Sequence, residues 1–388
     1  MSTDAVYLDF AATTPTDEHV IDVMTALMRV DEFGNASAVH AAGIRNRRHI
    51  DTAAEQLGTL VGAPADTLVW TSGATESNNL AIQGVAQQRA HRGKHLISMA
   101  TEHKAVTDTF RALDKSGFEV TWLPPAENGV LELEVLAAAL RDETQLVSVM
   151  HVNNETGVIQ DIEAIGALCR ERGIAFHCDI AQSAGKLPLN LASLPIDLAS
   201  MTAHKMYGPV GIGALYVAKN AQIHLQPLMH GGRQQGGLRP GTLPTPLIAG
   251  FGAAADIAAA RMASDHATLS ALRDRLWAGI QTVAGIRLNG DLAVSYPGLL
   301  NVSVADVEGE SLLLALEPLL VATGSACNAL NQEPSAVLRA MGRSDLEAQS
   351  AIRFSLGRTT TAAHIDVAVE RYCHAVAWLR KMAPEAAA

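Results

Sequence analysis

One lysine of this chain stands where a buried amine could do covalent chemistry. Lys205 lies in a short polar segment, Thr202–Pro209, between two apolar runs at 196–200 and 212–217. Apolar runs of that length, bounded by glycine and proline, are typical of buried strands. Desolvation lowers the pKa of an ammonium group, and a neutral lysine amine can form a Schiff base. The alternative for a single lysine is an ordinary surface position in a loop, and the residues around Lys205 decide between the two.

Strand and helix patterns alternate along the chain and would position such a lysine. Strand-like runs are predicted at 67–71, 95–100, 119–123, 145–150, 174–178, 196–201 and 212–217. Helical patterns fill most of the gaps, at 76–89, 106–115, 133–140 and 162–172. This alternation predicts an α/β fold with a mostly parallel seven-stranded sheet that is covered on both faces. Ligands bind such sheets beyond the carboxyl ends of the strands.

Side chains that can carry charge or hydrogen bonds follow several of these strand candidates. The stretch Ser72–Asn79 opens a helix with small residues, so its N–H groups and hydroxyls could bind a phosphate. A plain helix cap with Glu76 in the first turn is the alternative. The other stretches are Thr101–Lys104, His151–Gly157, Asp179–Gly185 and the Lys205 segment. We expect these stretches to form one site at that edge of the sheet.

The character of the sequence changes after residue 245. Alanine-rich helical patterns extend to about 283, strand candidates follow at 299–304, 319–323 and 352–356, and a closing helix starts near 362. This pattern predicts a smaller α+β domain that the N-terminal arm joins. We expect a large cofactor-binding domain over residues 16–260 and a small domain formed by residues 1–15 and 261–388.

Composition limits the kinds of function that the chain can have. With 388 residues, of which 48% are hydrophobic and 18% charged, it is a globular protein with a large core. A net charge of -11 argues against direct nucleic-acid binding. No apolar run reaches the length of a membrane span, and the first residues lack the basic start and apolar core of a signal peptide. We therefore expect a cytoplasmic protein without membrane contact.

The four cysteines, Cys169, Cys178, Cys327 and Cys373, have neither CxxC spacing nor a paired arrangement. In a cytoplasmic chain this favours free thiols over disulfides and predicts no metal site. Packing is the expected role of Cys169, Cys178 and Cys373, which fall in helix and strand patterns. Cys327 differs, because the residues around it, 324–332, are small and polar. We expect its thiol to be exposed and able to ionise to the reactive thiolate.

The side chains that could take part in chemistry occur in ordered motifs. These motifs resemble those of the NifS/IscS-type cysteine desulfurases. The similarity extends nearly end to end, from Tyr7 to Arg358, and is closest to the IscS branch. The matching motifs are Thr101–His103, Asp179–Gln182, Thr202–Lys205, Gly241–Pro244, Ala322–Cys327 and Ile352–Arg358. The resemblance implies a homodimeric enzyme of the class V aminotransferase type, with fold type I and pyridoxal 5'-phosphate as cofactor. The function it implies is removal of sulfur from L-cysteine to give L-alanine and a persulfide.

The resemblance also implies a role for each residue of the cofactor site. Lys205 would hold the cofactor covalently and then shuttle protons, and Asp179 would pair with the pyridinium nitrogen. His103 would stack on the ring as an acid–base group, and Gln182 would hydrogen-bond the phenolate oxygen. The phosphate ligands would be Thr75, Thr202 and His204, with Thr242 from the second subunit of a dimer.

On the substrate side, the resemblance implies that Arg353 clamps the carboxylate of cysteine, with Asn154 beside it. Cys327 would attack the substrate sulfur, keep it as a persulfide and deliver it to an acceptor protein for iron–sulfur cluster assembly or thiolation. The sequence departs from the family pattern at three places near or before this cysteine. They are 322–323, where two serines are usual, 328–329, where a Thr-Ser pair is common, and 233–240, which lacks a usual acidic–basic pair. These differences leave loop motion and acceptor docking open.

Two other functions stay open at this point. A selenocysteine lyase, or another pyridoxal-phosphate lyase of this fold, would not need Cys327, so substituting Cys327 distinguishes it from a desulfurase. A non-catalytic sulfur carrier with the same fold would show no cofactor absorbance. Residues 383–388, Ala-Pro-Glu-Ala-Ala-Ala, offer little that could bury against a partner. We therefore expect weak docking of an iron–sulfur scaffold protein.

Overall fold

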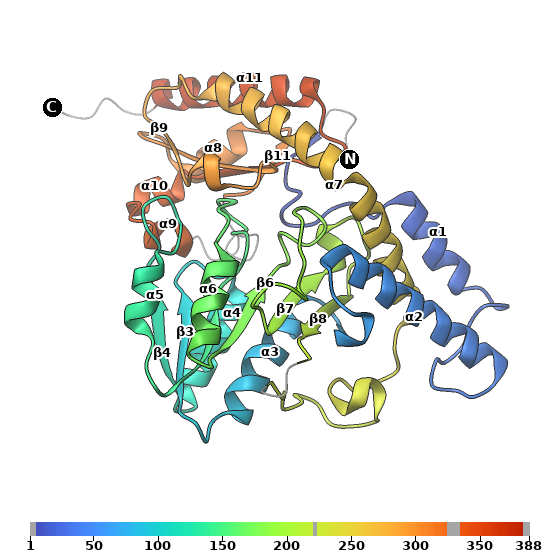
Figure 1. Ribbon diagram of the computed structural model, residues 1–388. Helices are drawn as coiled ribbons and strands as arrows, with labels where there is room; N and C mark the ends of the chain where they lie inside the picture. Colours follow the sequence, from blue (N-terminus) through green and yellow to red (C-terminus); the bar gives the residue numbers. More distant parts are fainter. Residues whose placement is uncertain (1–4, 220–222, 324–333, 383–388) are drawn as a thin grey trace.

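The computed structural model describes residues 5–219, 223–323 and 334–382. Its centre is a seven-stranded sheet in the order β2-β8-β7-β6-β5-β3-β4 (Figure 1). The strands are β2 (Leu68–Thr71), β3 (His95–Met99), β4 (Glu119–Leu123), β5 (Thr144–Ser148), β6 (Ala175–Asp179), β7 (Leu198–Thr202) and β8 (Gly213–Val217). All neighbours run parallel except β8, which is antiparallel to β2 and to β7. The structure confirms the predicted α/β fold with its mostly parallel sheet.

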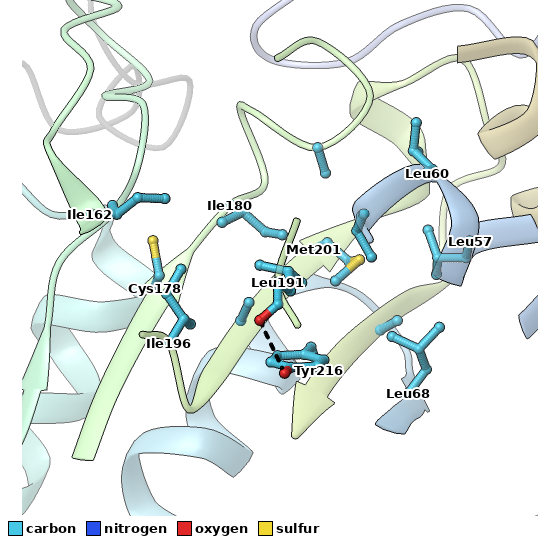
Figure 2. Packing of buried hydrophobic residues seen from close by; sticks show 14 of the residues in the cluster. Leu57, Leu60, Leu68, Ile162, Cys178, Ile180, Leu191, Ile196, Met201 and Tyr216 are labelled. Atoms are coloured by element: carbon cyan, nitrogen blue, oxygen red, sulfur yellow. Dashed lines mark hydrogen bonds between the residues drawn. The ribbon is translucent and has the colours of Figure 1, made fainter. Parts of the chain in front are cut away.

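The sheet is covered on both faces because successive side chains of its strands enter two different cores. Leu96 and Leu146 pack with side chains of α3 (Ala74–Gln88) and α4 (Lys104–Lys115). The next residues, Ile97 and Val147, belong to the opposite core. That core also holds side chains of α2 (Ala41–Val61), α5 (Leu133–Ala139) and α6 (Ile162–Glu171). Figure 2 shows part of it, where the Tyr216 hydroxyl donates to Leu191 O at 3.2 Å.

Helix boundaries follow from local sequence. Helix α2 starts after His40, whose Nδ1 accepts a hydrogen bond from Gly43 N at 3.3 Å. It ends before Gly62, which has φ +63°, a conformation that favours glycine at a helix C-terminus. The shorter helix α1 (Glu18–Leu27) precedes it and starts after Asp17, whose carboxylate accepts from His19 N at 3.0 Å.

A smaller α+β unit lies beside the sheet. Its antiparallel strands, in the order β12-β10-β9, are β12 (Ile352–Ser355), β10 (Leu299–Val304) and β9 (Ile286–Leu288). Strand β1 (Val6–Tyr7) pairs in parallel with β11 (Leu319–Leu320), and Leu8 is buried in the core of this unit. The helices are α8 (Gly309–Ala315), α9 (Ala336–Ala340), α10 (Asp345–Gln349) and α11 (Ala362–Met382). The strand predicted at 319–323 is the shorter β11. After Leu320 the chain no longer pairs with β1, and Ala322 forms an isolated β-bridge with Arg353 instead.

One helix, α7 (Thr245–Ile280), runs through both units (Figure 1), where the sequence predicted several helices. Phe251 in its first half packs in the core of the large sheet, and Leu276 in its second half packs in the core of the smaller unit. The predicted domain boundary at 260/261 falls inside this helix and stays a prediction. Judged by length and composition alone, α7 is the one helix among the described residues that could cross a membrane. Half of its most apolar stretch is buried in the protein.

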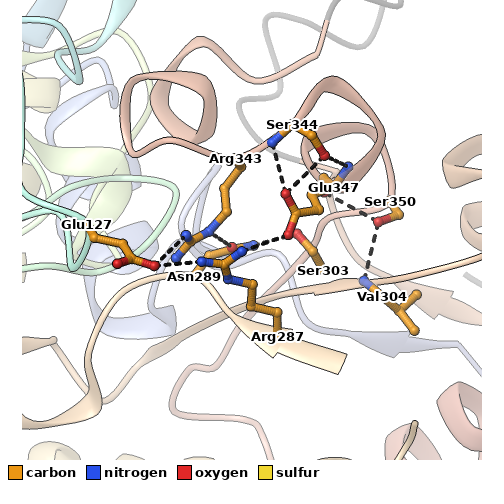
Figure 3. Close-up of polar contacts among 9 residues, drawn as sticks. All are labelled: Glu127, Arg287, Asn289, Ser303, Val304, Arg343, Ser344, Glu347 and Ser350. Atoms are coloured by element: carbon orange, nitrogen blue, oxygen red, sulfur yellow. Dashed lines mark hydrogen bonds and ion pairs between the residues drawn. The ribbon is translucent and has the colours of Figure 1, made fainter. Parts of the chain in front are cut away.

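Polar side chains connect the smaller unit to the segment between β4 and α5 (Figure 3). Arg343 is buried, and it donates from Nε to Asn289 Oδ1 at 2.9 Å and from Nη1 to Glu127 at 3.4 Å. Arg287 bridges Glu127 and Glu347, at 2.6 and 2.9 Å. Because β9, β10 and β12 are paired, this network holds the small sheet against the large one.

Candidate active site

A cavity of about 380 Å³ lies at the carboxyl ends of the parallel strands. The residues that line it come from the ends of β3, β5, β6 and β7, from the start of α3 and from β12. Nine of the predicted site residues are among them: Thr75, His103, Asn154, Asp179, Gln182, Thr202, His204, Lys205 and Arg353. The structure therefore places around one cavity the stretches that were expected to meet at this edge of the sheet.

Lys205 ends a short 3₁₀ turn, Ala203–Lys205, that follows β7 directly. The N-terminal arm holds this turn, because the backbone N and Oγ1 of Thr14 both donate to His204 O at 2.9 Å. Tyr207 has φ +65°, which is rare for a residue with a side chain. Its N–H donates to Thr14 Oγ1 at 2.8 Å, and the Arg358 guanidinium lies 4.1 Å from its ring centroid. These contacts fix the backbone that presents Lys205 to the cavity.

Asp179 is the last residue of β6 and is almost fully buried. Its Oδ2 accepts from Asn78 Nδ2 at 2.7 Å, and its Oδ1 accepts from Ala181 N at 2.9 Å. The two donors fix the plane of the carboxylate at the cavity wall. Asn78 is fully buried in α3 and was not predicted as a site residue, because the stretch that contains it was associated with a phosphate.

His103 caps the N-terminus of α4, where its Nδ1 accepts from Ala105 N at 3.1 Å. A neutral imidazole that accepts at Nδ1 carries its proton on Nε2. Burial and the positive charge of Lys205 lower the pKa of His103, whereas Asp179 opposes them. The ring is therefore neutral at physiological pH and can exchange a proton at Nε2.

The part of the cavity near the start of α3 suits an anion. Thr75 lies in the first turn of this helix, where backbone N–H groups and the helix dipole favour negative charge. Thr202 and His204 also line it. Burial, followed by the charges of Lys205 and Lys186, lowers the pKa of His204 to about 4. A Cβ at Gly213 would lie 2.6 Å from the backbone of Gly73, so only glycine lets β8 approach the start of α3.

Glu76 lies in the first turn of α3, as in the helix-cap alternative, although the N-cap residue Gly73 makes no side-chain cap bond. Its Oε2 accepts from Ser72 N at 2.7 Å, and its Oε1 pairs with Arg239 Nε at 2.8 Å. Burial of the carboxyl group opposes ionisation, but the hydrogen bonds from Arg239 and Ser72 outweigh it and lower the pKa of Glu76. The Arg239 ion pair offsets the negative charge that Glu76 brings to this end of the cavity.

Arg353 and Asn154 line the cavity from β12 and from the segment after β5. Arg353 is 1% exposed, and its Nη2 donates to Asp9 Oδ1 at 2.6 Å while its Nη1 donates to Asn154 O at 2.8 Å. Its Nε and the Oδ1 of Asn154 are buried and have no hydrogen-bond partner among the residues that the structure describes. Buried polar groups are normally paired. A carboxylate bound here would satisfy the guanidinium, in keeping with the predicted substrate clamp.

Two predicted residues are not among the cavity lining. Thr242 is exposed on the single chain and was predicted to serve the second subunit of a dimer. Cys327 lies outside the described residues. The described residues before and after this segment are hydrogen-bonded to residues at or next to the cavity. Before it, Ala322 O accepts from Arg353 N at 2.7 Å. After it, the Ser335 hydroxyl donates to Glu155, the neighbour of Asn154.

The other three cysteines are packing residues, as predicted. Cys169 and Cys178 are completely buried, and Cys373 is half-buried. Burial raises the pKa of Cys169 to about 12, and it also raises the pKa of Cys178 and of Cys373. These thiols are protonated at neutral pH and are poor nucleophiles.

The sequence did not single out two further ionisable residues near the cavity. Glu102 precedes His103, and its Oε1 accepts from Met150 N at 2.7 Å. Burial raises the pKa of Glu102 well above its usual range, so the carboxyl group is neutral. Lys186 donates to Gln182 Oε1 at 2.8 Å. The four-residue spacing of Gln182 and Lys186 was the only sequence signal for this contact.

The sequence profile of the class-V aminotransferases matches residues 6–367 of this chain. The structure of a NifS-like protein superposes with a TM-score of 0.90 at 33% identity, covering 97% of this chain and 100% of that one. The chain therefore belongs to the class-V aminotransferase family, which has fold type I and uses pyridoxal phosphate.

Within that family, the chain belongs to the cysteine desulfurases. It is 53% identical over 381 residues to the cysteine desulfurase IscS of Shewanella sp. (strain W3-18-1), covering 98% of this chain and 94% of that one. The cysteine desulfurase IscS of Shewanella baltica (strain OS185) matches to the same extent, 53% over 381 residues with 98% and 94% coverage. The structure of SspA in complex with cysteine is 37% identical, with a TM-score of 0.81 over 92% of this chain and 99% of that one.

The donor set of the cavity fits pyridoxal phosphate. A lysine amine, a fixed carboxylate, a neutral imidazole and a helix N-terminus surround one space. Arg353 also lines the cavity, and its buried Nε has no hydrogen-bond partner among the described residues. Among the residues described, no group of three His, Cys, Asp or Glu side chains could hold a metal ion.

Proposed function

We propose that Lys205 binds pyridoxal phosphate covalently, with Asp179 at the ring nitrogen, His103 against the ring and Gln182 at the ring oxygen. The support is their convergence on one cavity at the sheet edge, with Asp179 and His103 each fixed by hydrogen bonds. The bound cofactor supplies an electron sink for the substrate. Thr75, Thr202 and His204 would bind its phosphate beside the start of α3, where the backbone N–H groups favour an anion.

The substrate carboxylate would bind Arg353, with Asn154 beside it. The buried Nε of Arg353, a donor without a partner among the described residues, supports this assignment, and Arg353 and Asn154 both line the cavity. A guanidinium binds a carboxylate through two parallel hydrogen bonds, which fixes orientation as well as position. Lys205 and the Nε2 of His103 would then exchange protons with the bound amino acid at its reacting carbons.

Cys327 would receive the sulfur. Its thiolate attacks the Sγ of substrate cysteine, forming an S–S bond while the substrate Cβ–Sγ bond breaks. The electron pair of the broken bond passes to the substrate carbon, which takes up a proton and leaves as alanine. Cys327 then carries the persulfide, and transfer of its outer sulfur to an acceptor thiol restores the thiol. The raised pKa values and burial of Cys169 and Cys178 support Cys327 as the nucleophile, because those thiols are inert.

The observation that carries the proposal is the cavity that joins the cofactor groups to Arg353, a buried arginine whose Nε has no partner among the described residues. Cys327→Ser tests the sulfur step, with Cys373→Ser as a matched control. Cys327→Ser should bind the cofactor and cysteine but release no sulfide, and Cys373→Ser should keep normal turnover. Mass spectrometry after cysteine treatment should find the additional sulfur on Cys327. Sulfide release by Cys327→Ser would favour a lyase that needs no cysteine, such as a selenocysteine lyase.

The enzyme would act as a homodimer, with Thr242 reaching the phosphate of the partner's cofactor. Exposed apolar side chains between α1 and α2 support an interface: Val30 is 86%, Phe33 64% and Val39 94% exposed on the single chain. Subunit exchange between Thr242→Ala and Lys205→Ala tests the shared site. Each hybrid dimer holds one site with both groups intact, so activity should recover. Complete exchange without recovery would place Thr242 outside the partner's site.

The acceptor would be an iron–sulfur scaffold or a thiolation protein in the cytoplasm. The support is similarity to IscS enzymes, while the sequence differences from the family around Cys327 favour weak docking of a scaffold. Titrating the purified enzyme with a scaffold protein from the same source by calorimetry tests this. A submicromolar dissociation constant would contradict weak docking.

A further inference from the structure

Lys186 is a second lysine close to the cavity, and the proposed function gives it no role. Its Nζ donates to Gln182 Oε1 at 2.8 Å and lies 5.6 Å from the ring centroid of Tyr296. Lys186 also lines a second, enclosed cavity of about 30 Å³, which Lys205 lines as well. Lys186 is half-buried among an amide, an aromatic ring and another lysine, a position that needs a reason because desolvating an ammonium is costly.

The contacts of Gln182 show what Lys186 controls. A glutamine amide has one oxygen and two N–H groups, and its two ends have nearly the same shape. The Gln182 oxygen accepts from Lys186, and its nitrogen donates one N–H to Ala11 O at 2.9 Å. No described contact uses the other N–H, and Gln182 lines the large cavity. Since an ammonium only donates, it can pair with the amide oxygen and never with the nitrogen.

We propose that Lys186 is a positioning residue for Gln182: it holds the amide oxygen away from the cavity and strengthens the N–H that Gln182 directs to the ring oxygen of the cofactor. This inference rests on the proposed role of Gln182. A cation on an amide oxygen withdraws electron density from the amide nitrogen, so the N–H becomes a better donor. A better donor stabilises a negative ring oxygen and makes the linked Lys205 nitrogen less basic.

The charges around Lys186 fit this role. Burial, followed by the positive charges of Lys205 and Arg353, lowers the pKa of Lys186 to about 7. The negative charge of a bound cofactor would offset those two cations and favour the ammonium form of Lys186. The other ionisable groups at the small cavity are Tyr207, Asp265, His266, Tyr296 and Arg358.

The test is a pH titration of the visible cofactor band in the holoenzyme, without substrate. Lys186→Met should raise the midpoint by about one pH unit, because the donor to the ring oxygen is weakened. Lys186→Arg keeps the charge and should shift it less. Lys94→Met is the matched control, because Lys94 also lies over an aromatic ring, 5.9 Å from the Phe118 centroid, but away from the cavity. It should leave the midpoint unchanged.

A double-mutant cycle shows whether Lys186 acts through Gln182. In a Gln182→Leu background, Lys186→Met should add little further shift, and equal shifts in both backgrounds would overturn the proposal. The affinity of the apoenzyme for pyridoxal phosphate is a second readout and should fall about three- to tenfold in Lys186→Met. Wild-type midpoint and affinity in a folded Lys186→Met protein would also overturn it. None of these readouts involves Cys327, so they are independent of the sulfur-transfer step.

Discussion

The cofactor side and the substrate side of the cavity are built in different ways. Asp179 ends a strand of the large sheet, His103 and Lys205 follow two others, and each is fixed by its own segment or by a neighbouring element. Arg353 comes from the smaller unit, and its partners Asp9 and Asn154 are 344 and 199 residues away in sequence. Its guanidinium keeps an unpaired Nε among the described residues.

This difference separates two tasks. The groups toward the cofactor are paired before any ligand binds, so little reorganisation opposes binding or catalysis. The substrate arginine is only partly paired, so a carboxylate can complete its hydrogen bonds and gain affinity from doing so. Changes on the cofactor side should therefore alter the cofactor spectrum, whereas changes on the substrate side should alter KM.

The largest effect is expected for Asp179→Asn. Loss of the carboxylate at the ring nitrogen should lower kcat/KM by about 10³-fold, which is about 4 kcal/mol, and change the cofactor band. Asn78→Ser removes one donor to Asp179 and should lower kcat/KM by about tenfold. Both are measured by steady-state kinetics and absorption spectra. An Asp179→Asn enzyme with a wild-type spectrum would remove Asp179 from the cofactor side.

His177 should lower the free energy of unfolding by about 3 kcal/mol as the pH falls below neutral. It lies in β6, two residues before Asp179. Its ring bonds Ser148 and Ser200 at 2.7 and 2.9 Å, and burial lowers its pKa to about 4. As pH falls from about 6.5 to 4, the unfolded chain takes up a proton that the folded ring does not, so stability is lost in that window. Urea unfolding of His177→Gln at several pH values should show a shallower decline, and exposed His19→Gln should follow the wild type.

Arg353→Lys should raise KM for cysteine by about 30-fold, or about 2 kcal/mol, because the charge is kept but the two-pronged contact is lost. The cofactor band should not change. Steady-state kinetics and an absorption spectrum of the same preparation measure both quantities. An altered band with an unchanged KM would reverse the roles of the two sides.

The smallest effect is expected for Asp9→Asn. The amide can still accept from Arg353, but the arginine charge loses its counter-charge, so the free energy of unfolding should fall by about 1 kcal/mol. The carboxylate of Asp9 is 20% exposed, which keeps this loss below that of a fully buried pair. Thermal or urea unfolding measures it, and a spectral change in this variant would show that the two sides are coupled.

The same contrast explains what the sequence could predict. The alternation of strands and helices predicted the sheet, and the position of Asp179 and Lys205 after strands predicted their meeting at one edge. Arg353 was placed only by resemblance to a family, because no local pattern connects β12 with Asp9 or Asn154. Asn78 and Lys186 were missed, because their roles come from contacts with Asp179 and Gln182 that spacing alone does not determine. The continuity of α7 was also missed, since its alanine-rich sequence suits several short helices as well as one long one.

The most direct test of the account is to find which lysine holds the cofactor. Borohydride reduction of the holoenzyme, followed by digestion and mass spectrometry, fixes the cofactor on that lysine. The account predicts the modified residue to be Lys205, with no such adduct and no turnover in Lys205→Ala. A reduced adduct on Lys186 in the wild-type enzyme, or a reducible link that persists in Lys205→Ala, would contradict it.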